Sequence, residues 1–402
     1  MANKKISIGL FGFGVVGQGL YDVLNHSQGL SASINTICVK DRNKKRKIDL
    51  FYFTYEKNDI LNRKDIDVVV ELIDNAQDAL EIVTTAMKNG INVVTANKKM
   101  LADNFELLFK LQQENGVSLI YEGAVGGSIP IIRNLEEYYD NELLSSIRGL
   151  LNGSCNYILT CMELNNMSFA DALAKAQQNG FAETDAWLDV AGFDTLNKLC
   201  LLTAHAFGVI LKPEQVLTLG IQNISDDDIL YARAKGLRIK LLATARKVGE
   251  KLHVFAMPHF VSKDSEFYNA LYENNAIEVE GAFSDKQYFV GKGAGSYPTG
   301  SAVLSDISAL TYKYRYGYRK LKKVKSQLGE NLNAVHLLDN SINQKVYIRY
   351  KDKAELNGIE ILEIDESYES KKINYLVATV SLKSLFHLKE SRSQTVFVCA
   401  VS

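Results

Sequence analysis

The sequence predicts an α/β protein: a doubly wound parallel sheet, then an α+β domain with an antiparallel sheet, then a small third α+β domain. Strand and helix patterns alternate over the first 120 residues, which is typical of a parallel sheet with helices on both faces. A glycine-rich turn joins the first expected strand to the first expected helix. From about residue 238, strand patterns follow one another between glycines and charges, as in an antiparallel sheet. The chain has 402 residues, which suffices for two or three domains.

The first domain is expected at residues 1–130, completed by a returning helix within about residues 296–318. Short apolar runs predict its strands, at residues 6–11, 34–39, 67–73, 92–95 and 117–121. Amphipathic stretches predict its helices, at residues 16–24, 76–88, 105–113 and, after the second domain, 301–314.

The second domain, expected at residues 131–295, is predicted to mix helices with an antiparallel sheet. Its expected helices are residues 127–139, 155–163 and 169–178, and a further apolar stripe follows Gly192. Its expected strands are residues 147–151, 241–248, 253–260, 276–283 and 287–290. The third domain, at residues 330–402, is expected to hold strands at residues 345–350, 359–364, 375–381 and 395–401 and one helix at residues 382–388.

The composition is that of an ordinary soluble globular protein, with 47% hydrophobic and 23% charged residues. A net charge of −1 provides no global attraction for nucleic acid, although residues 42–47 form a local basic run. No apolar run approaches the roughly 18 residues of a membrane helix, and the N-terminus is too short and glycine-rich for a signal peptide. Five scattered cysteines without metal-ligand spacing favour reduced thiols and a cytoplasmic location.

The first glycine-rich turn has the sequence Gly12-Phe13-Gly14-Val15-Val16-Gly17. This G-x-G-x-x-G pattern follows a strand and opens a helix, which is the context that a dinucleotide-binding turn requires. Gly12 allows the tight turn, Gly14 lets a pyrophosphate approach the helix N-terminus, and Gly17 permits close packing of helix on sheet. A glycine-rich turn without a ligand is the competing interpretation. The position of the turn favours a Rossmann-type domain that binds a nicotinamide dinucleotide.

The residues after the second strand bear on the choice between NAD and NADP. An acidic residue there binds the ribose of NAD, whereas a basic one accommodates the 2′-phosphate of NADP. Asp41 indicates NAD, whereas Lys40, Arg42 and the cations that follow indicate NADP. A solvated basic loop is the alternative. We expect NADP, with NAD left open.

Two further segments could complete a cofactor site. Lys98 and Lys99 follow a strand of the parallel sheet, beyond whose carboxyl ends ligands bind in such folds. Adjacent side chains diverge, so at most one of these lysines is expected in a site, and a surface position is at least as probable. The second glycine-rich turn, residues 291–295, lets a flat ring lie close to the backbone or simply joins a strand to a helix.

Residues 180–198 carry four acids and end in a lysine within an apolar helical stripe. Lys198 lies one helical turn after Asp194, so the two side chains share a face. A lysine near a core needs a partner or loses its proton readily, which suits a proton-transferring group. Taken alone, the pair is more often a structural ion pair than a site.

A cysteine at a helix start offers a different chemistry. Cys155 could be a nucleophile toward an aldehyde, but no histidine lies nearby to act as its base, and a packed thiol is favoured. Ser154 is more simply an N-cap or a substrate hydrogen-bond donor. The six histidines do not cluster, so lysine is the available proton donor for a dehydrogenase.

Six segments together resemble homoserine dehydrogenase, in the order of that family. They read GFGVVGQG, VVTANKK, YEGAVGGSIPIIRNL, RGLLNGSCNYILT, GFAETDAWLDVAGFDTLNKL and GKGAGSYPTGSAVLSDI. The resemblance covers about residues 6–315. It implies reversible reduction of L-aspartate 4-semialdehyde to L-homoserine with NAD(P)H, a step toward threonine, methionine and isoleucine. It also implies that residues 131–295 bind this small substrate and mediate dimerisation, in a homodimer or higher homo-oligomer. From the charge and hydropathy we expect no nucleic-acid and no membrane partner.

The resemblance assigns roles to individual positions. Lys198 matches the usual proton donor, and Lys98 matches the second lysine of the site. Residues that match the substrate pocket are Glu183 and Asp194, which would hold the amino group, and Gly153, Ser154 and Asp189. Residues that match the cofactor site are Gly12, Phe13, Gly14, Val15, Val16, Gly17, Lys40, Arg42, Lys98, Gly293 and Gly295. Residues that match a monovalent-cation (sodium) site, built largely from carbonyl oxygens, are Glu122, Val125, Gly127 and Ile129.

The chain departs from the family pattern at a few positions. Phe181 stands where Tyr is frequent, Ala186 where Pro is frequent, Ser154 where Thr is usual and Gly300 where Ala is usual. None of these removes a charged site residue. Residues 330–402 resemble an ACT domain only in part, because the segment after the first strand is too short for the expected helix; we expect a degenerate ACT-like domain with lost or altered threonine feedback.

Two other functions stay open at the level of sequence. A thiol-dependent semialdehyde dehydrogenase would use Cys155, and a redox-sensing regulator would bind the cofactor without turnover. The retention of Glu183, Asp194, Lys198 and Lys98 argues against the regulator, since a sensor needs no proton donor.

Overall fold

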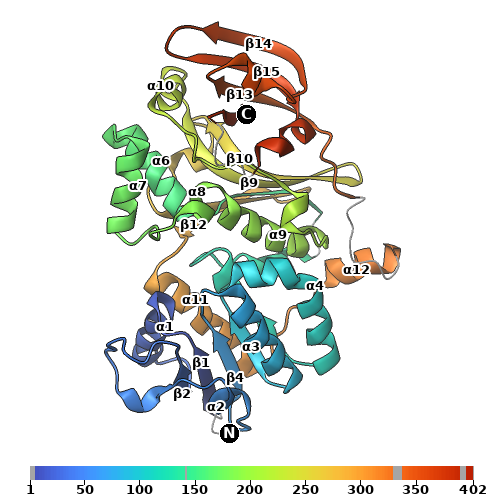
Figure 1. Ribbon diagram of the computed structural model, residues 1–402. Coiled ribbons are helices and arrows are strands. Elements are labelled where there is room, and N and C mark those ends of the chain that lie inside the picture. Colours follow the sequence, from blue (N-terminus) through green and yellow to red (C-terminus); the bar gives the residue numbers. More distant parts are fainter. Residues whose placement is uncertain (1–4, 141–142, 329–336, 390–394, 402) are drawn as a thin grey trace. The chain divides into compact units, whose positions relative to one another are not determined.

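The computed structural model describes residues 5–140, 143–328, 337–389 and 395–401. The chain divides into two compact units, each discontinuous in sequence (Figure 1). The first unit combines Met1–Asp140 with Lys292–Val324, and the second combines Asn141–Gly291 with Lys325–Ser402.

The first unit contains a six-stranded sheet in which all neighbouring strands are parallel. Its strands are β1 (Ile6–Phe11), β2 (Ala32–Cys38), β3 (Phe53–Thr54), β4 (Val68–Glu71), β5 (Asn92–Thr95) and β6 (Leu119–Ile120). The order β3-β2-β1-β4-β5-β6 reverses direction between β1 and β4. The predicted doubly wound sheet is therefore confirmed, and its ligand crevice is expected beyond the carboxyl ends of β1 and β4.

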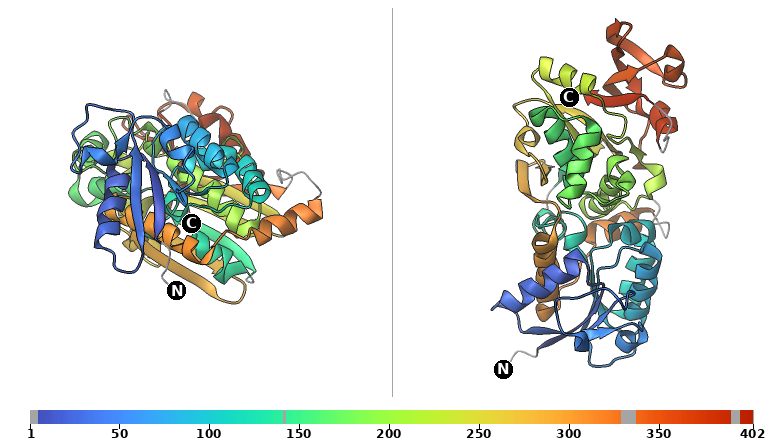
Figure 2. Two further views of the ribbon diagram at one scale, coloured as in Figure 1. Left: turned by 90° about the horizontal axis from the view of Figure 1, so that it is seen from below. Right: turned by 60° about the vertical axis from the view of Figure 1, so that its left-hand side comes forward.

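Helices cover both faces of this sheet (Figures 1 and 2). The described helices of this unit are α1 (Val15–His26), α2 (Asn58–Leu61), α3 (Ala76–Lys88), α4 (Lys98–Asn115), α5 (Ile132–Glu136) and α11 (Ser296–Ala309). The division between the two units falls within a further helix, α12 (Arg319–Leu328). α1 packs on the returning helix α11, and α3 packs on α4. A Cβ on Gly300 of α11 would lie 2.7 Å from the backbone of Gly19 in α1, so the glycine at this position permits the close helix contact.

One predicted helix of the chain is largely wrong. Residues 127–139 contain only the short α5 and the 3₁₀ turn Tyr138–Asp140, because the preceding backbone cannot be helical. Gly127 has a φ of +62°, and Pro130 follows it closely. The returning helix also begins and ends five residues earlier than predicted, at Ser296–Ala309.

The second unit contains a ten-stranded sheet of order β12-β11-β7-β9-β10-β16-β13-β15-β14, with β8 beside β10. Its strands are β7 (Leu144–Leu150), β8 (Leu217–Thr218), β9 (Arg238–Val248), β10 (Lys251–Val261), β11 (Asn274–Gly281), β12 (Asp285–Lys292), β13 (Asn343–Tyr350), β14 (Ile361–Glu369), β15 (Asn374–Ser381) and β16 (Phe397–Val401). The predicted sheet is antiparallel at β7, β9, β10 and β11, but β8 and β16 pair with β10 in parallel, so the sheet is mixed.

Among its described residues, the second unit contains the helices α6 (Gly153–Asn165), α7 (Phe169–Gln178), α8 (Trp187–Val190), α9 (Phe193–Phe207) and α10 (Asp226–Ala234). α6 and α9 pack on strands β7, β9, β10 and β11 (Figure 1). α9 is buried along nearly its whole length, which explains why the apolar stripe after Gly192 is so continuous. The sheet therefore supports the helices that carry residues 153–198.

The C-terminal strands do not form a third compact unit. β16 pairs with β10, and a buried ion pair between Arg349 of β13 and Asp228 of α10, at 2.9 Å, joins this segment to the helices before it. The helix predicted at residues 382–388 is a 3₁₀ helix, Leu382–Leu388. Residues 330–336 and 390–394 of the predicted third domain lie outside the described residues.

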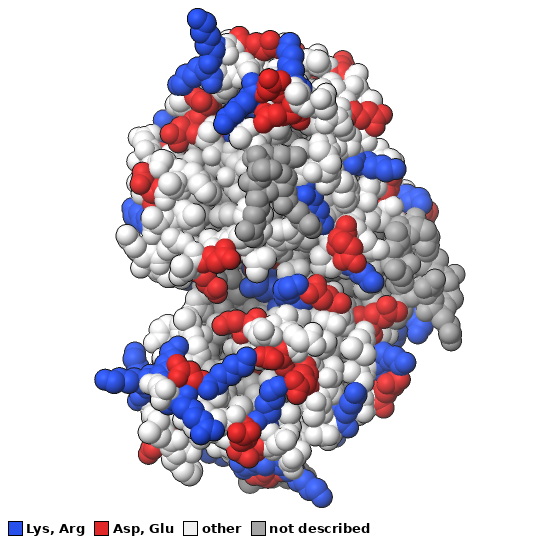
Figure 3. All heavy atoms as spheres, in the orientation of Figure 1, with Lys and Arg blue, Asp and Glu red and all other residues white. Residues whose placement is uncertain are grey.

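The helices and the surface charge of the chain can be compared with its composition. Among the described residues, no helix has the length and apolarity that crossing a bilayer demands. Basic and acidic side chains are interspersed over each unit on the face seen in Figure 3, in accord with the net charge of −1.

Candidate active site

Three glycines shape the turn between β1 and α1, each for a different steric reason. Gly12 has a φ of +92°, and a Cβ there would lie 2.5 Å from the carbonyl oxygen of Leu72. A Cβ on Gly17 would lie 2.4 Å from the carbonyl oxygen of Gly12, so the helix contacts the turn closely. A Cβ on Gly14 would meet nothing within 4 Å, which leaves open space at the start of α1. These residues fit a pyrophosphate on the helix N-terminus.

The other residues of this turn contribute mainly through their backbone. Phe13 is buried and packs edge-on against Tyr21 and Phe53, with ring centroids 6.0 and 5.4 Å apart. Val15 and Val16 begin α1, and the side chain of Val15 is exposed. The Phe13 side chain therefore belongs to the core, and a ligand would meet the peptide N–H groups here.

Asp41, just beyond β2, stabilises a tight turn in the basic segment. Its Oδ1 accepts the backbone N–H groups of Asn43 at 2.8 Å and of Lys44 at 3.2 Å. Arg46 folds back and donates to the carbonyl oxygen of Asp41. One carboxylate oxygen of Asp41 is thus engaged by the turn itself.

The cations around Asp41 are exposed. Lys40 forms an ion pair with Asp78 at the start of α3, and the Arg42 guanidinium lies 4.6 Å from the ring centroid of Tyr55. Blue side chains gather over the loop after β2, at the lower left of Figure 3. The structure therefore keeps the basic groups at the end of β2, close to the turn that carries Asp41.

The two lysines after β5 differ in their surroundings. Lys99 is half exposed and forms a surface ion pair with Asp103, at 2.6 Å. Lys98 is partly buried as the first residue of α4. Its neighbour Asn97 caps this helix and donates to the carbonyl oxygen of Ile73 at 3.1 Å, which fixes the turn at the carboxyl edge of the sheet. Lys98 is therefore the lysine placed at that edge.

A buried carboxyl group is hydrogen-bonded to the residues next to this turn. Glu71 ends β4, and its two oxygens accept the N–H of Ile73 at 2.7 Å and the hydroxyl of Thr95 at 2.5 Å. The Thr95 hydroxyl in turn accepts the N–H of Asn97 at 3.0 Å. Burial raises the pKa of Glu71 to about 7, although the Thr95 hydrogen bond opposes that rise.

The second glycine-rich turn packs against another loop of the first unit. Gly295 has a φ of +123° and precedes α11. A Cβ on Gly127 would lie 2.5 Å from the carbonyl oxygens of Lys292 and Gly293, and the N–H of Ser128 donates to Lys292 at 2.9 Å. Gly293 and Gly295 are thus held beside the loop of residues 122–129.

That loop is organised by the carboxylate of Glu122. Its two oxygens accept the N–H groups of Ile132 at 2.7 Å and Arg133 at 2.9 Å, at the start of α5. The N–H of Glu122 donates to the buried carboxyl group of Asp306, at 2.9 Å. Burial, together with the negative charge of Glu122, raises the pKa of Asp306 well above its usual range.

The side chain of Glu122 is therefore engaged, and a cation would meet carbonyl oxygens. Within the described residues, the carbonyl oxygens of Val125 and Gly127 accept no hydrogen bond, whereas those of Glu122 and Ile129 each accept one from the loop backbone. No cluster of three His, Cys, Asp or Glu side chains suited to a metal occurs in the described part of the chain. Carbonyl oxygens of this kind fit a hard cation better than the engaged carboxylate does.

Helix α9 carries two buried, oppositely charged side chains. Lys198 and Asp194 have side chains only 9% and 6% exposed, and their Nζ and Oδ2 atoms are 2.7 Å apart. Lys198 Nζ also donates to the carbonyl oxygen of Leu151, at 2.7 Å. Asn275 of β11 donates to the same carbonyl oxygen, at 3.0 Å. The surface ion pair that is the more common interpretation of this spacing is excluded, because both charges are buried.

A second acid joins this pair through Asn152. The Nδ2 atom of Asn152 donates to Asp189 Oδ1 at 2.7 Å and to Asp194 Oδ2 at 2.9 Å. Its Oδ1 atom accepts the N–H of Cys155 and caps α6. Asp189, Asp194 and Lys198, which the resemblance assigns to one site, are therefore brought together by α6, α8 and α9.

Glu183 and Ser154 are placed differently from each other. Glu183 is exposed, and its carboxylate makes no hydrogen bond with other described residues. The Ser154 hydroxyl donates to the carbonyl oxygen of Phe181, so the N-cap interpretation is wrong; the cap is Asn152. A Cβ on Gly153 would lie 2.7 Å from a backbone oxygen, so the start of α6 requires this glycine.

Cys155 is a packed thiol. It is fully buried, its Sγ donates to the carbonyl oxygen of Asp189 at 3.2 Å, and burial followed by the charge of Asp189 raises its pKa well above the usual range. A thiol in this state is a poor nucleophile. The structure therefore disfavours the thiol-dependent alternative.

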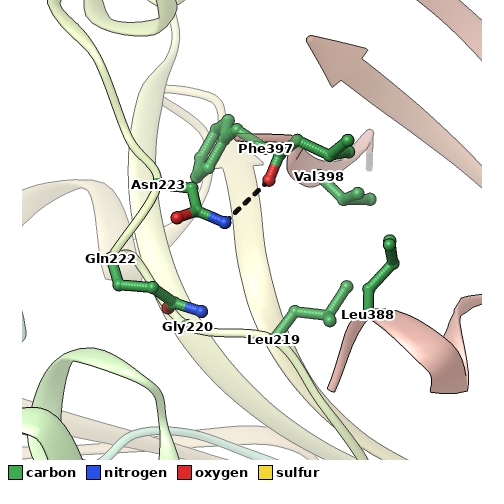
Figure 4. Close-up of a pocket in the computed structure, with 8 residues that line it drawn as sticks. Leu219, Gly220, Gln222, Asn223, Leu388, Phe397 and Val398 are labelled. Atoms are coloured by element: carbon green, nitrogen blue, oxygen red, sulfur yellow. Dashed lines mark hydrogen bonds between the residues drawn. The ribbon is translucent and has the colours of Figure 1, made fainter. Parts of the chain in front are cut away.

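A small cavity lies elsewhere in the second unit, between the loop after β8 and the C-terminal segment (Figure 4). Asn223 reaches across it and donates to the carbonyl oxygen of Val396, at 3.0 Å. Leu219 and Leu388 contribute apolar walls. None of the predicted site residues lines this cavity.

Sequence reasoning missed three polar residues that organise the site. Asn152 donates to Asp189 and Asp194, and Asn275 donates to the Leu151 carbonyl oxygen that also accepts from Lys198. Glu71 accepts from Thr95 across two strands. Asn152 stands before a helix that begins with glycine, and this N-cap signal could have found it. Glu71, an acid inside an otherwise apolar strand, is a comparable signal of a buried polar contact.

Comparisons with known proteins show which family the chain resembles over most of its length. The family model described as homoserine dehydrogenase matches residues 130–308, and the one described as homoserine dehydrogenase, NAD binding domain, matches residues 12–122. Homoserine dehydrogenase of Bacillus subtilis is 34% identical over 340 residues, which are 82% of this chain and 78% of that protein.

Solved structures extend the similarity to the C-terminal segment. A homoserine dehydrogenase from Thiobacillus denitrificans has a TM-score of 0.81 at 28% identity, covering 99% of this chain and 98% of the other. That of Staphylococcus aureus (S. aureus), at pH 6.5, has a TM-score of 0.73 at 28% identity, covering 99% of each chain. The fold is thus shared beyond residue 308, where the family models end.

Proposed function

The chain belongs to the homoserine dehydrogenase family, and on that premise we propose which of its residues bind the reactants and which transfer the proton. The family consists of NAD(P)-dependent oxidoreductases that interconvert L-aspartate 4-semialdehyde and L-homoserine. The activity of the chain is therefore this reversible reduction, a step in the biosynthesis of threonine and methionine.

Lys198 is the proposed proton donor. The observation that carries the proposal is its buried ammonium group, held at 2.7 Å by both Asp194 and the Leu151 carbonyl oxygen. These contacts use two of its three N–H bonds, which leaves one for a substrate oxygen. The bound nicotinamide supplies the hydride to the aldehyde carbon. As negative charge grows on the aldehyde oxygen, Lys198 would stabilise and then protonate it. For Lys98, the support is its match to the second lysine of the family's site.

The acids would bind the substrate amino group. Asp189 and Asp194 share the amide of Asn152 and, with Lys198, leave one net negative charge, which suits an ammonium ion. Glu183 would add a carboxylate when substrate binds. The backbone N–H groups of Gly153 and Ser154, at the start of the 13-residue α6, would receive the substrate carboxylate.

NADP is the proposed cofactor in preference to NAD. The glycine turn fits a dinucleotide, and Lys40 and Arg42 are exposed at the end of β2, where a 2′-phosphate would lie. One carboxylate oxygen of Asp41 already accepts two N–H groups of its own turn, so it is less suited to bind the ribose of NAD. Gly293 and Gly295 would let the nicotinamide ring lie against backbone, beside Lys98.

A monovalent cation is proposed at the loop of residues 122–129. The carbonyl oxygens of Glu122, Val125, Gly127 and Ile129 would hold it. The support is the two carbonyl oxygens that accept no hydrogen bond in the described residues, on Val125 and Gly127. The ion would fix the loop against which Gly293 packs, and comparison of the enzyme in sodium with the enzyme in tetramethylammonium chloride tests this.

The C-terminal segment is proposed to be a reduced ACT-like fold. Its strands lie in the order β16-β13-β15-β14, which is the order of a βαββαβ sheet, and short 3₁₀ helices, Lys353–Leu356 and Leu382–Leu388, stand where two α-helices would be. We expect lost or altered threonine feedback. Titration calorimetry with threonine tests it, and tight binding to this segment would refute the loss.

The assembly state follows from the family alone. We propose a homodimer or higher homo-oligomer in the cytoplasm. Light scattering during size-exclusion chromatography measures the mass of the assembly. The mass of a monomer would contradict the proposed homodimer or higher homo-oligomer.

The experiment that tests the activity uses the purified chain with NADPH and aspartate semialdehyde. Homoserine should accumulate in step with NADPH loss, and Cys155→Ala should keep most of the rate, because the thiol is packed. Binding of NADPH without turnover would instead favour a redox-sensing regulator, and loss of turnover in Cys155→Ala would favour the thiol route.

A further inference from the structure

We infer that Asn152 is a positioning residue for the reduction: its single amide group holds Asp189 and Asp194 in the arrangement that Lys198 and the substrate ammonium group need. This inference rests on the proposed role of Lys198. Asn152 is 4% exposed, and Asp194 Oδ2 accepts both Lys198 Nζ at 2.7 Å and Asn152 Nδ2 at 2.9 Å.

Every hydrogen-bonding atom of the Asn152 amide has a partner. Its oxygen accepts the N–H of Cys155 at 2.7 Å, and its nitrogen donates one hydrogen to Asp189 and the other to Asp194. The reverse orientation of the amide would turn its oxygen toward two carboxylates and its nitrogen toward an N–H group. The chemistry of the partners therefore assigns the orientation.

Asparagine suits this position because it donates twice without adding charge. A lysine or arginine would neutralise the acids and compete with the substrate ammonium group. An aspartate would bring a third carboxylate against two others. The neutral amide keeps two carboxylates close together while one ammonium group, Lys198, leaves a net negative charge for the substrate.

Asn152 also caps α6, and a capping role alone would explain its burial. Two substitutions separate the roles. Asn152→Ser and Asn152→Asp both retain an oxygen that can cap the helix, since Ser and Asp are favoured N-caps. Ser cannot donate to both acids, and Asp cannot donate to either when ionised.

The test measures steady-state kinetics and melting of the full chain for these two variants. Ser168→Ala is the matched control, because it removes the N-cap of the neighbouring helix α7. We expect kcat/KM for aspartate semialdehyde to fall about 10- to 100-fold in Asn152→Ser and further in Asn152→Asp. The KM for NADPH should stay unchanged, and the low-pH limb of the activity profile should move to higher pH, since carboxylates that lose a donor are protonated more readily.

The melting temperature distinguishes a variant that has lost its fold from one in which only the site acids are displaced. Asn152→Ser should melt within about 3 °C of wild type, as should Ser168→Ala, which should keep full activity. If Asn152→Ser melts at a much lower temperature than the wild type, the kinetics of Asn152→Asp decide whether the inference holds. Wild-type kcat/KM and an unmoved pH profile in both Asn152 variants would overturn the inference. If Lys198→Ala is inactive while both Asn152 variants are active, only this inference fails; if Lys198→Ala is active, the proposed function fails first.

Discussion

Glu71 should make the stability of the chain depend on pH near neutrality, and Glu71→Gln should remove that dependence. The carboxyl group is fully buried at the end of β4 and bonded to Ile73 and Thr95. Burial raises its pKa from 4.5 to about 7. The glutamine side chain has nearly the same shape and can still accept the N–H of Ile73.

The sign follows from the raised pKa. Below pH 4.5 the group is protonated in both the folded and the unfolded chain, and the stability it contributes is fully present. Between pH 4.5 and about 7 only the folded chain holds the proton, so stability falls as pH rises and the loss is complete above about pH 7. The shift corresponds to a loss of about 3 kcal/mol in the free energy of unfolding.

The assay is urea unfolding of wild type and Glu71→Gln at several pH values from 5 to 8, followed by fluorescence. The difference between the two proteins should grow with pH up to about 7 and then level, with the wild type becoming the less stable partner. Glu106→Gln, an exposed acid on α4, controls for the loss of one negative charge. Curves for wild type and Glu71→Gln that stay parallel across this range would refute the reasoning.

Four other substitutions follow from contacts in the two units. Gly17→Ala should lower the free energy of unfolding by about 2 kcal/mol, because its Cβ would meet a backbone oxygen at 2.4 Å. Gly14→Ala should keep the stability of the wild type but weaken NADPH binding about tenfold in a fluorescence titration. Equal melting temperatures of the two variants would contradict this. Asp194→Asn leaves the Lys198 ammonium group buried without its counter-ion. The free energy of unfolding in urea should therefore fall by about 3 kcal/mol, and kcat should fall at least about 100-fold. Kinetics close to those of the wild type would show that the pair is only structural. Arg42→Ala should raise the KM for NADPH about tenfold and leave that for NADH unchanged, and equal effects on both cofactors would place the residue outside the phosphate site.

Features carried by local pattern could be predicted from the sequence. β1, the glycine turn and α1 follow one another within about twenty residues, and each of Gly12, Gly14 and Gly17 has the steric surroundings that its position in the motif predicts. The Asp194–Lys198 contact is also local, since four residues on a helix bring the two side chains together. Whether the pair was buried depended on how α9 packs, and the sequence alone favoured the surface.

Features that depend on distant segments could not be predicted. Asn152 meets Asp189 and Asp194 across about forty residues, and the parallel pairing of β16 with β10 joins strands over a hundred residues apart. The helix predicted over residues 127–139 fails for a local reason instead, because Gly127 has a positive φ and Pro130 follows it. The contacts of Asn152 and of β16 leave no local signal, because they form only between distant segments.

The central claim is that the Lys198 ammonium group donates the proton. The most direct measurement is the rate of NADPH oxidation by aspartate semialdehyde in Lys198→Ala relative to wild type, with NADPH binding measured on the same preparations. The buried position of Lys198 beside Asp194 predicts a fall in kcat of about 100- to 10,000-fold with unchanged NADPH affinity. Equal rates in the two proteins would contradict the account.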